Sequence, residues 1–465
     1  MRLSHSRRVV AARFDEPNLV SAAGLVPVLR LAGDAGLGAL AGELLTVPGD
    51  KGANAGGKVT ALVAGMLAGA DSIDDMGVLR HGAMRTLFDR PYAPSTLGSF
   101  LRAFAFGHVR QLDAVASRLL ACLAVRAPLL PGIGEGLVCV DVDDTVIEVH
   151  GYAKQGASFG YSGVRGLNAL LATVSTGHSA PVIVAQRLRK GSANSARGAQ
   201  RLVRDALAAV RSLRPADAGS QVLLRADSAF YGHAIVGAAV RAGALVSVTA
   251  RMDPKVKAAI TSIAEDAWTP IEYPEAIYDQ ETGRWISRAE VAEVPFTAFS
   301  SRPRAEQIPG RLVVRRIPDL GPRASTGQGS LFQLWRFHAF FTTSALDTVT
   351  ADKTHRGHAI IEQVNADLKN SALAHLPSGR FTANCAWLVC AVMAFNLTRA
   401  AATIAGGRLA KATTATIRRA VIAVPARIAS SARRLTLHLP AAWPWQQAWD
   451  QVFTRTCGPP RPAAS

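Results

Sequence analysis

The order of apolar segments between residues 137 and 250 limits the possible folds of this chain more than any other feature. Apolar runs of strand length predict five strands, at 137–143, 167–176, 181–188, 221–226 and 244–250. Two segments with apolar residues at helical spacing, 195–213 and 233–242, follow the third and the fourth strand. Three strands, a helix, a strand, a helix and a strand make an α/β unit.

The sequence on either side of this α/β unit shows different patterns of apolar residues. Residues 1–130 show helical spacing of apolar residues, and the helix starting at Pro94, with a Ser or Thr cap, fits either DNA recognition or packing. Short β-like runs broken by Pro and Gly predict a β-rich insertion at 251–345. Helix returns at 346–400, and a basic helical region is expected at 401–465, with a loose tail from Pro459.

Charge points to a polyanionic partner. Lys and Arg number 52 against 34 Asp and Glu, a net charge of +18. Nucleic acid is the leading candidate and an anionic membrane the second, whereas a merely solubilising surface remains open for any single basic run. One run surrounds Arg189 and Lys190. No acidic residue lies between Asp367 and Asp450, a stretch that holds ten basic residues, including Arg433.

Neither membrane insertion nor export is expected. The N-terminal segment is basic but has no apolar core of signal-peptide length. The most apolar stretch, Cys385 to Leu397, is too short to span a bilayer and is interpreted as a buried helix. Five cysteines in 465 residues form no disulfide framework. These features predict a cytoplasmic protein.

Three acidic residues stand out by their positions. In the first predicted strand Asp141 and Asp143 share one face and three valines the other, so the acids need a cation, a partner or a solvated edge. Asp227 ends an apolar strand, where either an active site or a helix cap is typical. Glu362 lies in a predicted helix that begins near Lys353.

That helix predicts a polar stripe, because His355, His358, Glu362 and Lys369 are spaced by three, four and seven residues. An ordinary exposed face is the alternative. Zinc is a weaker one, because the chain offers no matching Cys or His partners. Hard oxygen ligands instead suit two Mg²⁺ or Mn²⁺ ions, which can drive an in-line phosphoryl displacement. The acids and the basic surface together make a metal-dependent phosphodiester enzyme plausible.

At these residues the sequence resembles the DDE transposases of bacterial insertion sequences. The likeness is greatest to the group called the thirteen-eighty family, which is related to the insertion-sequence-four group. It spans about residue 140 to residue 400. The matching stretches are VDVDDTVIEVHGYAKQGASFGYSGVRGLNALLA, LRKGSANSARG, LLRADSAFYG, RFHAFFTT, HRGHAIIEQVNADLKN and LPSGRFTANCAWLVCAVMAFNLTR.

The resemblance implies an RNase H-like catalytic domain with the first Asp on the first strand, the second on the fourth, and the Glu on a helix after a β-rich insertion. It places the metal-binding catalytic triad at Asp143, Asp227 and Glu362, with Asp141 as a rival for the first acid. It further implies a homodimer on double-stranded DNA, comprising the element ends and the target.

Related transposases carry a Tyr-x2-Arg-x3-Glu-x6-Lys helix whose Tyr, Arg and Lys contact DNA phosphates. Glu362 and Lys369 match this pattern, whereas His355 and His358 replace the Tyr and the Arg, with Arg356 close by. The resemblance therefore implies DNA contacts by Lys369, Arg356, His355 and His358, in addition to the basic run at Arg189 and Lys190. A DNA-binding regulator without catalysis, or a two-metal nuclease without strand transfer, are the alternatives.

Overall fold

The computed structural model describes residues 12–88, 91–160, 163–279, 284–318, 335–431 and 434–458. Its centre is a mixed sheet in which five strands stand in the order β5–β4–β2–β6–β7, and the two-residue strand β3 (Ser158–Phe159) also pairs with β4. Only β4 runs against the others, because it is antiparallel to β2 and β5, whereas β2, β6 and β7 are mutually parallel. The strands are β2 (Leu137–Glu148), β4 (Arg165–Ser175), β5 (Val182–Lys190), β6 (Gln221–Ala226) and β7 (Leu245–Thr249). All five predicted strands are confirmed.

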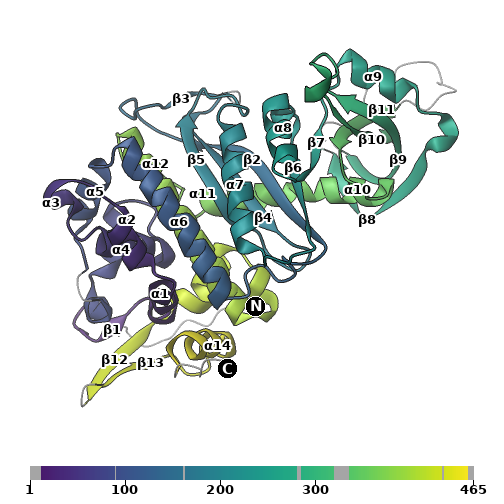
Figure 1. Ribbon diagram of the computed structural model, residues 1–465. Coiled ribbons are helices and arrows are strands. Elements are labelled where there is room, and N and C mark those ends of the chain that lie inside the picture. The colour runs from purple at the N-terminus through teal and green to yellow at the C-terminus, as the bar shows by residue number, and fades with distance from the viewer. Residues whose placement is uncertain are drawn as a thin grey trace.

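The insertion extends this sheet. Strand β11 pairs antiparallel with β7, and β10, β9 and β8 continue outward in that order. The sequence predicted strands here, and it gave no sign that they would join the central sheet (Figure 1). The elements are α9 (Pro254–Thr261), β8 (Thr269–Asp279), β9 (Arg284–Ala298), β10 (Ile308–Pro318) and β11 (Trp335–Thr342).

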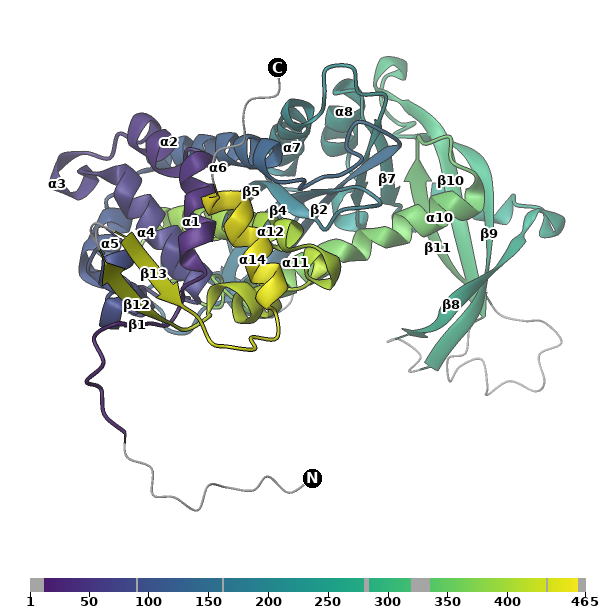
Figure 2. The same cartoon turned by 90° about the horizontal axis from the view of Figure 1, so that it is seen from below.

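Helices cover both faces of the central strands. Both predicted helices, α7 (Ala199–Leu213) and α8 (His233–Arg241), are present. They lie on one side, and the segment from residue 348 to residue 369 lies on the other (Figure 2). That segment consists of α10 (Thr348–Arg356), a 3₁₀ turn η7 (Gly357–Ala359) and α11 (Ile360–Lys369).

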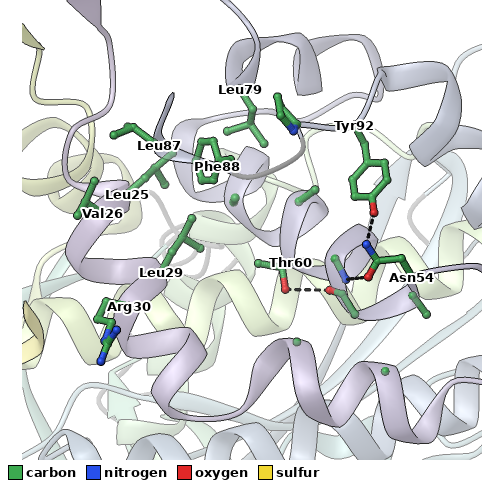
Figure 3. A pocket seen from close by; sticks show the side chains of 18 of the residues that line it. Leu25, Val26, Leu29, Arg30, Asn54, Thr60, Leu79, Leu87, Phe88 and Tyr92 are labelled. Atoms are coloured by element: carbon green, nitrogen blue, oxygen red, sulfur yellow. Dashed lines mark hydrogen bonds between the residues drawn. The ribbon is translucent and has the colours of Figure 1, made fainter. Parts of the chain in front are cut away.

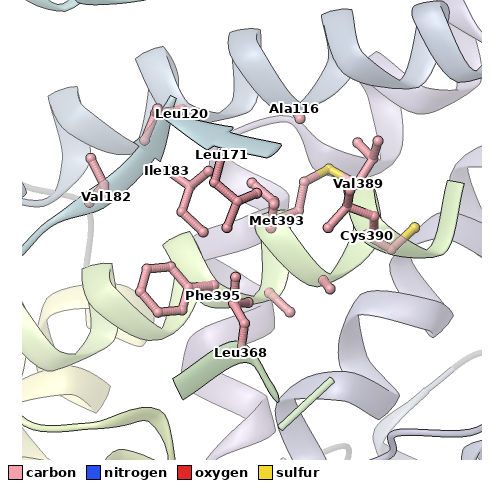
Figure 4. Packing of buried hydrophobic residues seen from close by; sticks show 14 of the residues in the cluster. Ala116, Leu120, Leu171, Val182, Ile183, Leu368, Val389, Cys390, Met393 and Phe395 are labelled. Atoms are coloured by element: carbon pink, nitrogen blue, oxygen red, sulfur yellow. The ribbon is translucent and has the colours of Figure 1, made fainter. Parts of the chain in front are cut away.

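The long helix α12 (Phe381–Ala405) contacts both the central sheet and the N-terminal helices. It packs against the sheet at β5 and against the N-terminal helices α4, α5 and α6 (Figure 4). By length and composition alone it could cross a membrane, but 89% of its most apolar window is buried within the protein. Burial on all sides explains its nearly continuous apolar sequence and confirms the expectation of a buried helix. The N-terminal helices are α1 (Leu25–Asp34), α2 (Leu37–Leu44), α3 (Gly49–Gly52), α4 (Ala55–Ala68), α5 (Pro94–Arg102) and α6 (Phe106–Arg126).

Two expectations are wrong. The C-terminal region is not wholly helical, because β12 (Ala426–Ser431) and β13 (Arg434–His438) form a hairpin that pairs with β1 (Leu19–Val20). Burial of alternate residues, Ala426 and Ile428, suits a strand, and the N-terminal partner strand completes the sheet. Helix α5 begins at Pro94, after Ala93, with no capping side chain. Helices α13 (Thr414–Ile417) and α14 (Gln446–Cys457) flank the hairpin, whereas Arg433 and the tail from Pro459 lie outside the described residues.

Candidate active site

Strand pairing brings two of the predicted acids to neighbouring positions. Strands β2 and β6 are parallel, with Val142 opposite Ala226, so Asp143 and Asp227 are the next residues on each strand. Strand β6 ends there, and the Asp227 side chain accepts a hydrogen bond from the Ala229 backbone N–H at 2.9 Å. Asp227 is thus a turn cap as well as an acid at a strand end. The helix-cap alternative is confirmed, and a catalytic role for Asp227 remains a prediction.

Asp141, the alternative for the first acid, has hydrogen-bond partners at both carboxylate oxygens. Its side chain is completely buried. Arg225 donates to both of its oxygens, from Nε at 2.8 Å and from Nη2 at 2.7 Å, and His358 Nδ1 lies 2.9 Å from Oδ1. A buried carboxylate with these partners is satisfied without a cation. The structure therefore favours Asp143 over Asp141 as the first ligand.

Asp144 is held by a buried arginine. Arg189 Nη2 donates to Asp144 Oδ2 at 2.7 Å, and Asn168 Nδ2 donates to the same oxygen. The remaining guanidinium donors reach Asn168 and three backbone carbonyls between residues 194 and 197. Only 8% of Arg189 is exposed, so its guanidinium is engaged inside the protein. Arg189 therefore has a structural role, and a DNA contact by this residue remains a prediction.

The surroundings of Asp143 and Asp227 disfavour the ionised form of both carboxyl groups. Burial raises the pKa of Asp143 to about 6, with smaller contributions from the negative charges of Asp144 and Asp227, while His358 opposes the shift. Desolvation by surrounding protein atoms also raises the pKa of Asp227, although its side chain is exposed to solvent. Repulsion and desolvation of this kind are relieved by a bound cation.

Helix α11 places the third acid above β2. A depression of about 370 Å³ lies between them, and its lining includes Asp143, Glu362 and Lys369. Glu362 and Lys369 are exposed. Asn365, between them on the helix, donates from Nδ2 to Asp143 Oδ2 at 2.8 Å. Asp227 is not part of this lining, and in the described part of the chain no three His, Cys, Asp or Glu side chains are grouped closely enough to hold a metal ion.

A larger hollow, of about 1280 Å³, lies among the N-terminal helices and is shown in Figure 3. Its lining is mainly aliphatic and glycine-rich, with Tyr92 and Asn54 at one side and Arg30 at another. None of the three predicted catalytic acids lines it. The chemistry-bearing residues therefore concentrate at the β2, β6 and α11 site.

The chain matches a known protein family along nearly its whole length. The sequence model described as transposase DDE domain, group 1, matches residues 3–457. The chain belongs to this DDE transposase family. No curated protein matches the sequence. Family membership indicates a function in DNA transposition and DNA as the substrate.

The histidines of this transposase occupy different environments. The two ring nitrogens of His355 lie 2.9 Å from Ser247 Oγ and 3.0 Å from Thr249 Oγ1, and the ring stacks on Phe340. Burial lowers the pKa of His355 to about 3, so the ring is neutral. Both ring nitrogens are engaged with these hydroxyls, and a DNA contact by His355 remains a prediction. His355 and His358 thus contact separate partners, which leaves no zinc pair.

The other predicted DNA contacts of the transposase differ in exposure. Arg356 Nε donates to the buried Asp352 at 2.8 Å. Lys190 and Lys369 are exposed, and Lys369 lies at the rim of the depression. The sequence analysis missed Arg225 and Asn365. The position of Arg225, a charged residue in an apolar strand two residues before Asp227, was the one available signal for its role.

Proposed function

We propose that this transposase binds the terminal inverted repeats of its insertion sequence, cleaves the DNA there, and transfers the freed strand ends to target DNA. Asp143, Asp227 and Glu362 would hold two divalent cations. The observation that carries the proposal is the placement of Asp143 and Asp227 at neighbouring positions of β2 and β6. Glu362 projects from the helix that packs across β2.

The strand order supports an RNase H-like assignment for the catalytic domain. In chain order β2 is the first and β6 the fourth of the five central strands, and these two carry the first and second acids. The insertion β8–β11 lies between Asp227 and the helix that carries Glu362. This arrangement matches what the resemblance to insertion-sequence transposases implies.

The donor set fits Mg²⁺ or Mn²⁺. Carboxylate oxygens are the ligands these ions prefer, and burial, which raises the pKa of Asp143, disfavours a carboxylate that has no cation beside it. Completing a three-carboxylate set requires the exposed side chains of Asp227 and Glu362 to move toward Asp143, which their exposure permits. Two bound ions would activate the attacking oxygen and stabilise the leaving one.

The residues of the chain itself position the DNA. The Lys369 ammonium, beside Glu362 on the depression, would bind a backbone phosphate next to the cleaved bond, and Lys190 would contact DNA farther away. The net charge of +18 supports binding of a polyanion. We further place this transposase in the thirteen-eighty family, in the bacterial cytoplasm, and acting as a homodimer on DNA because two element ends must be joined.

A cleavage assay tests the catalytic proposal. DNA from the flanks of the gene, carrying its inverted repeats, would be incubated with the full chain and Mg²⁺ or Mn²⁺, with EDTA as a control. We expect metal-dependent cuts at the repeat ends that Asp227→Asn and Glu362→Gln each slow by roughly a hundredfold or more. Glu148→Gln, an exposed carboxylate at the end of β2, is the matched control that retains activity.

The other outcomes separate the alternatives. Tight binding of the ends without cleavage in either metal would indicate a DNA-binding regulator. Cleavage without joining to target DNA would indicate a nuclease. For the phosphate contacts, Lys369→Ala should reduce the slope of log affinity against log salt by about one. Arg211→Ala on α7, across the sheet from α11, should leave that slope unchanged.

A further inference from the structure

A buried ion pair lies directly beneath the catalytic acids. Asp141 and Arg225 are register partners on β2 and β6, each two residues before an acid of the proposed triad. The side chains of both are almost entirely inaccessible, with 0% and 6% exposed. Alternate residues of a strand share a face, so this pair and Asp143 face the same side of the sheet. The cleavage chemistry proposed above makes no use of it.

The ion pair also reaches the helical segment that carries Glu362. Arg225 Nη1 donates to the Thr354 carbonyl at 2.6 Å, near the end of α10. The same nitrogen passes so close to Gly357 that a Cβ added there would lie 2.6 Å from it. His358 closes the link by bonding to Asp141. One arginine thus joins both catalytic strands to the junction between α10 and α11.

At that junction the α-helical hydrogen-bond pattern is interrupted. The 3₁₀ turn η7 separates α10 from α11, and a short 3₁₀ stretch between two α-helices is a typical hinge. His358 lies in this turn, and Glu362 follows it by four residues, in the first turn of α11. The direction of Glu362 therefore depends on how the turn is held.

A second contact holds helix α11 on the C-terminal side of Glu362. Asn365, three residues further along, is 6% exposed and donates to Asp143. Helix α11 is consequently attached to β2 at two points, His358 to Asp141 and Asn365 to Asp143, with Glu362 between them. Two attachments spaced by about two helical turns leave the intervening residue little freedom to tilt away.

We propose that the Arg225–Asp141–His358 link is a positioning device that orients Glu362 toward Asp143 and Asp227. This inference rests on the catalytic function proposed above. None of the three residues is a ligand or contacts the reacting phosphate; they act through the helix. Groups that orient metal ligands in this way typically change metal affinity or activity by 10- to 100-fold when they are removed.

The test uses His358, because changing it leaves the Asp141–Arg225 pair intact. His358→Leu removes the link, whereas His358→Asn keeps an N–H donor near the position of Nδ1. His375→Leu is the matched control, since His375 makes a similar bond to Asp71 at 3.1 Å on the exposed surface. Four quantities are measured for each full-length variant: Mn²⁺ affinity by calorimetry without DNA, DNA affinity at several salt concentrations, cleavage kinetics, and hydrogen exchange of residues 357–369.

For His358→Leu we expect a Mn²⁺ dissociation constant about tenfold higher, kcat lower by about 10- to 100-fold, and faster exchange in α11. The DNA dissociation constant should stay within about twofold of the wild type, because the residue does not bind phosphate. His358→Asn should restore most of each loss, and the control should resemble the wild type.

Unchanged exchange and Mn²⁺ affinity in His358→Leu would overturn the positioning role. So would a loss confined to DNA affinity and its salt dependence, which would make His358 a phosphate ligand. If the wild type neither binds Mn²⁺ nor cleaves DNA, the proposed function fails. The exchange measurement then still decides whether the link holds α11.

Discussion

Two aspartates separated by one residue show how strongly local partners decide the role of a side chain. Asp141 and Asp143 occupy the same face of β2, and the strand pattern cannot distinguish them. Arg225 and His358 bond to Asp141, whereas the side-chain partner of Asp143 is the amide of Asn365. Burial raises the pKa of Asp143, and no arginine bonds to it as Arg225 bonds to Asp141.

The charge on Asp143 should destabilise the metal-free protein. Its pKa is about 6 in the folded chain against 3.8 ordinarily, so the folded state binds the proton more tightly. The ionised form therefore costs stability as pH rises from 3.8 to 6, and the full cost is present above pH 6. After a discount for partial exposure, Asp143→Asn should raise the free energy of unfolding by about 1–2 kcal/mol at pH 7.5.

Denaturant titration without metal measures this effect. The gain should be about half as large at pH 5, where part of Asp143 is already protonated. Glu148→Gln, at an exposed carboxylate on the same strand, serves as the control. Added Mn²⁺ should stabilise the wild type and not the variant. A variant less stable than the wild type at pH 7.5 would contradict the assigned cost.

At the scale of elements, the structure divides what the sequence presented as one helix. A continuous helix from Lys353 would place His355, His358, Glu362 and Lys369 on a single stripe. The 3₁₀ turn at Gly357–Ala359 breaks that register, and His355 turns toward hydroxyls on β7. Glu362 and Lys369 keep the predicted relationship because both lie beyond the turn. Spacing arguments thus hold within an unbroken helix and fail across the break.

The close packing of helices α2 and α4 predicts the effect of a substitution at Gly56. Helices α2 and α4 approach so closely that a Cβ on Gly56 would lie 2.3 Å from the Gly38 carbonyl oxygen. Backbone must shift to admit it, so Gly56→Ala should destabilise the protein by about 1–3 kcal/mol. Gly33, exposed in α1 with no neighbour within 4 Å of its Cβ position, is the control.

In the control, Gly33→Ala should stabilise by about 0.5–1 kcal/mol, because alanine favours the helix. Thermal unfolding of both variants measures the difference. Equal midpoints for the two variants would mean that the α2–α4 contact is looser than the structure indicates.

At the scale of the whole molecule, one apolar core crosses the domain boundary expected near residue 130. Buried side chains of α1, α4, α6, β2, β5 and α12 belong to the same cluster. Asn396 of α12 bonds to both backbone groups of Ile183 in β5, and Asp113 of α6 pairs with Arg187 of β5. The N-terminal helices and the sheet are therefore joined by apolar and polar contacts alike.

A substitution at Trp387 tests whether the N-terminal helices and the sheet share one core. The Trp387 side chain is completely buried in α12, and its indole N–H donates to the Ala372 carbonyl at 2.7 Å. Trp387→Ala should cost about 3–5 kcal/mol. If the core is shared, hydrogen exchange should accelerate in α6 and in β5 together. Acceleration confined to the N-terminal helices would show that the two regions unfold separately.

The sequence by itself determined the order of strands and helices in the α/β unit, the burial of α12 and the positions of the acids. It also supported membership of the DDE transposase family, which the family match confirms. These properties follow from local hydrophobic periodicity and from short motifs. The narrower family group, the domain boundaries, the metal ligands and the DNA contacts remain predictions.

The tertiary structure decided which charged residues pair and which strands meet. Asp141 bonds to Arg225, 84 residues away, and to His358, 217 residues away. Arg189 is drawn inward by Asp144 and Asn168, and β12 finds its partner at Leu19–Val20. Burial makes such pairing obligatory, because an unpaired charge or backbone group inside a protein is costly. No local pattern indicates which distant residue will supply the partner.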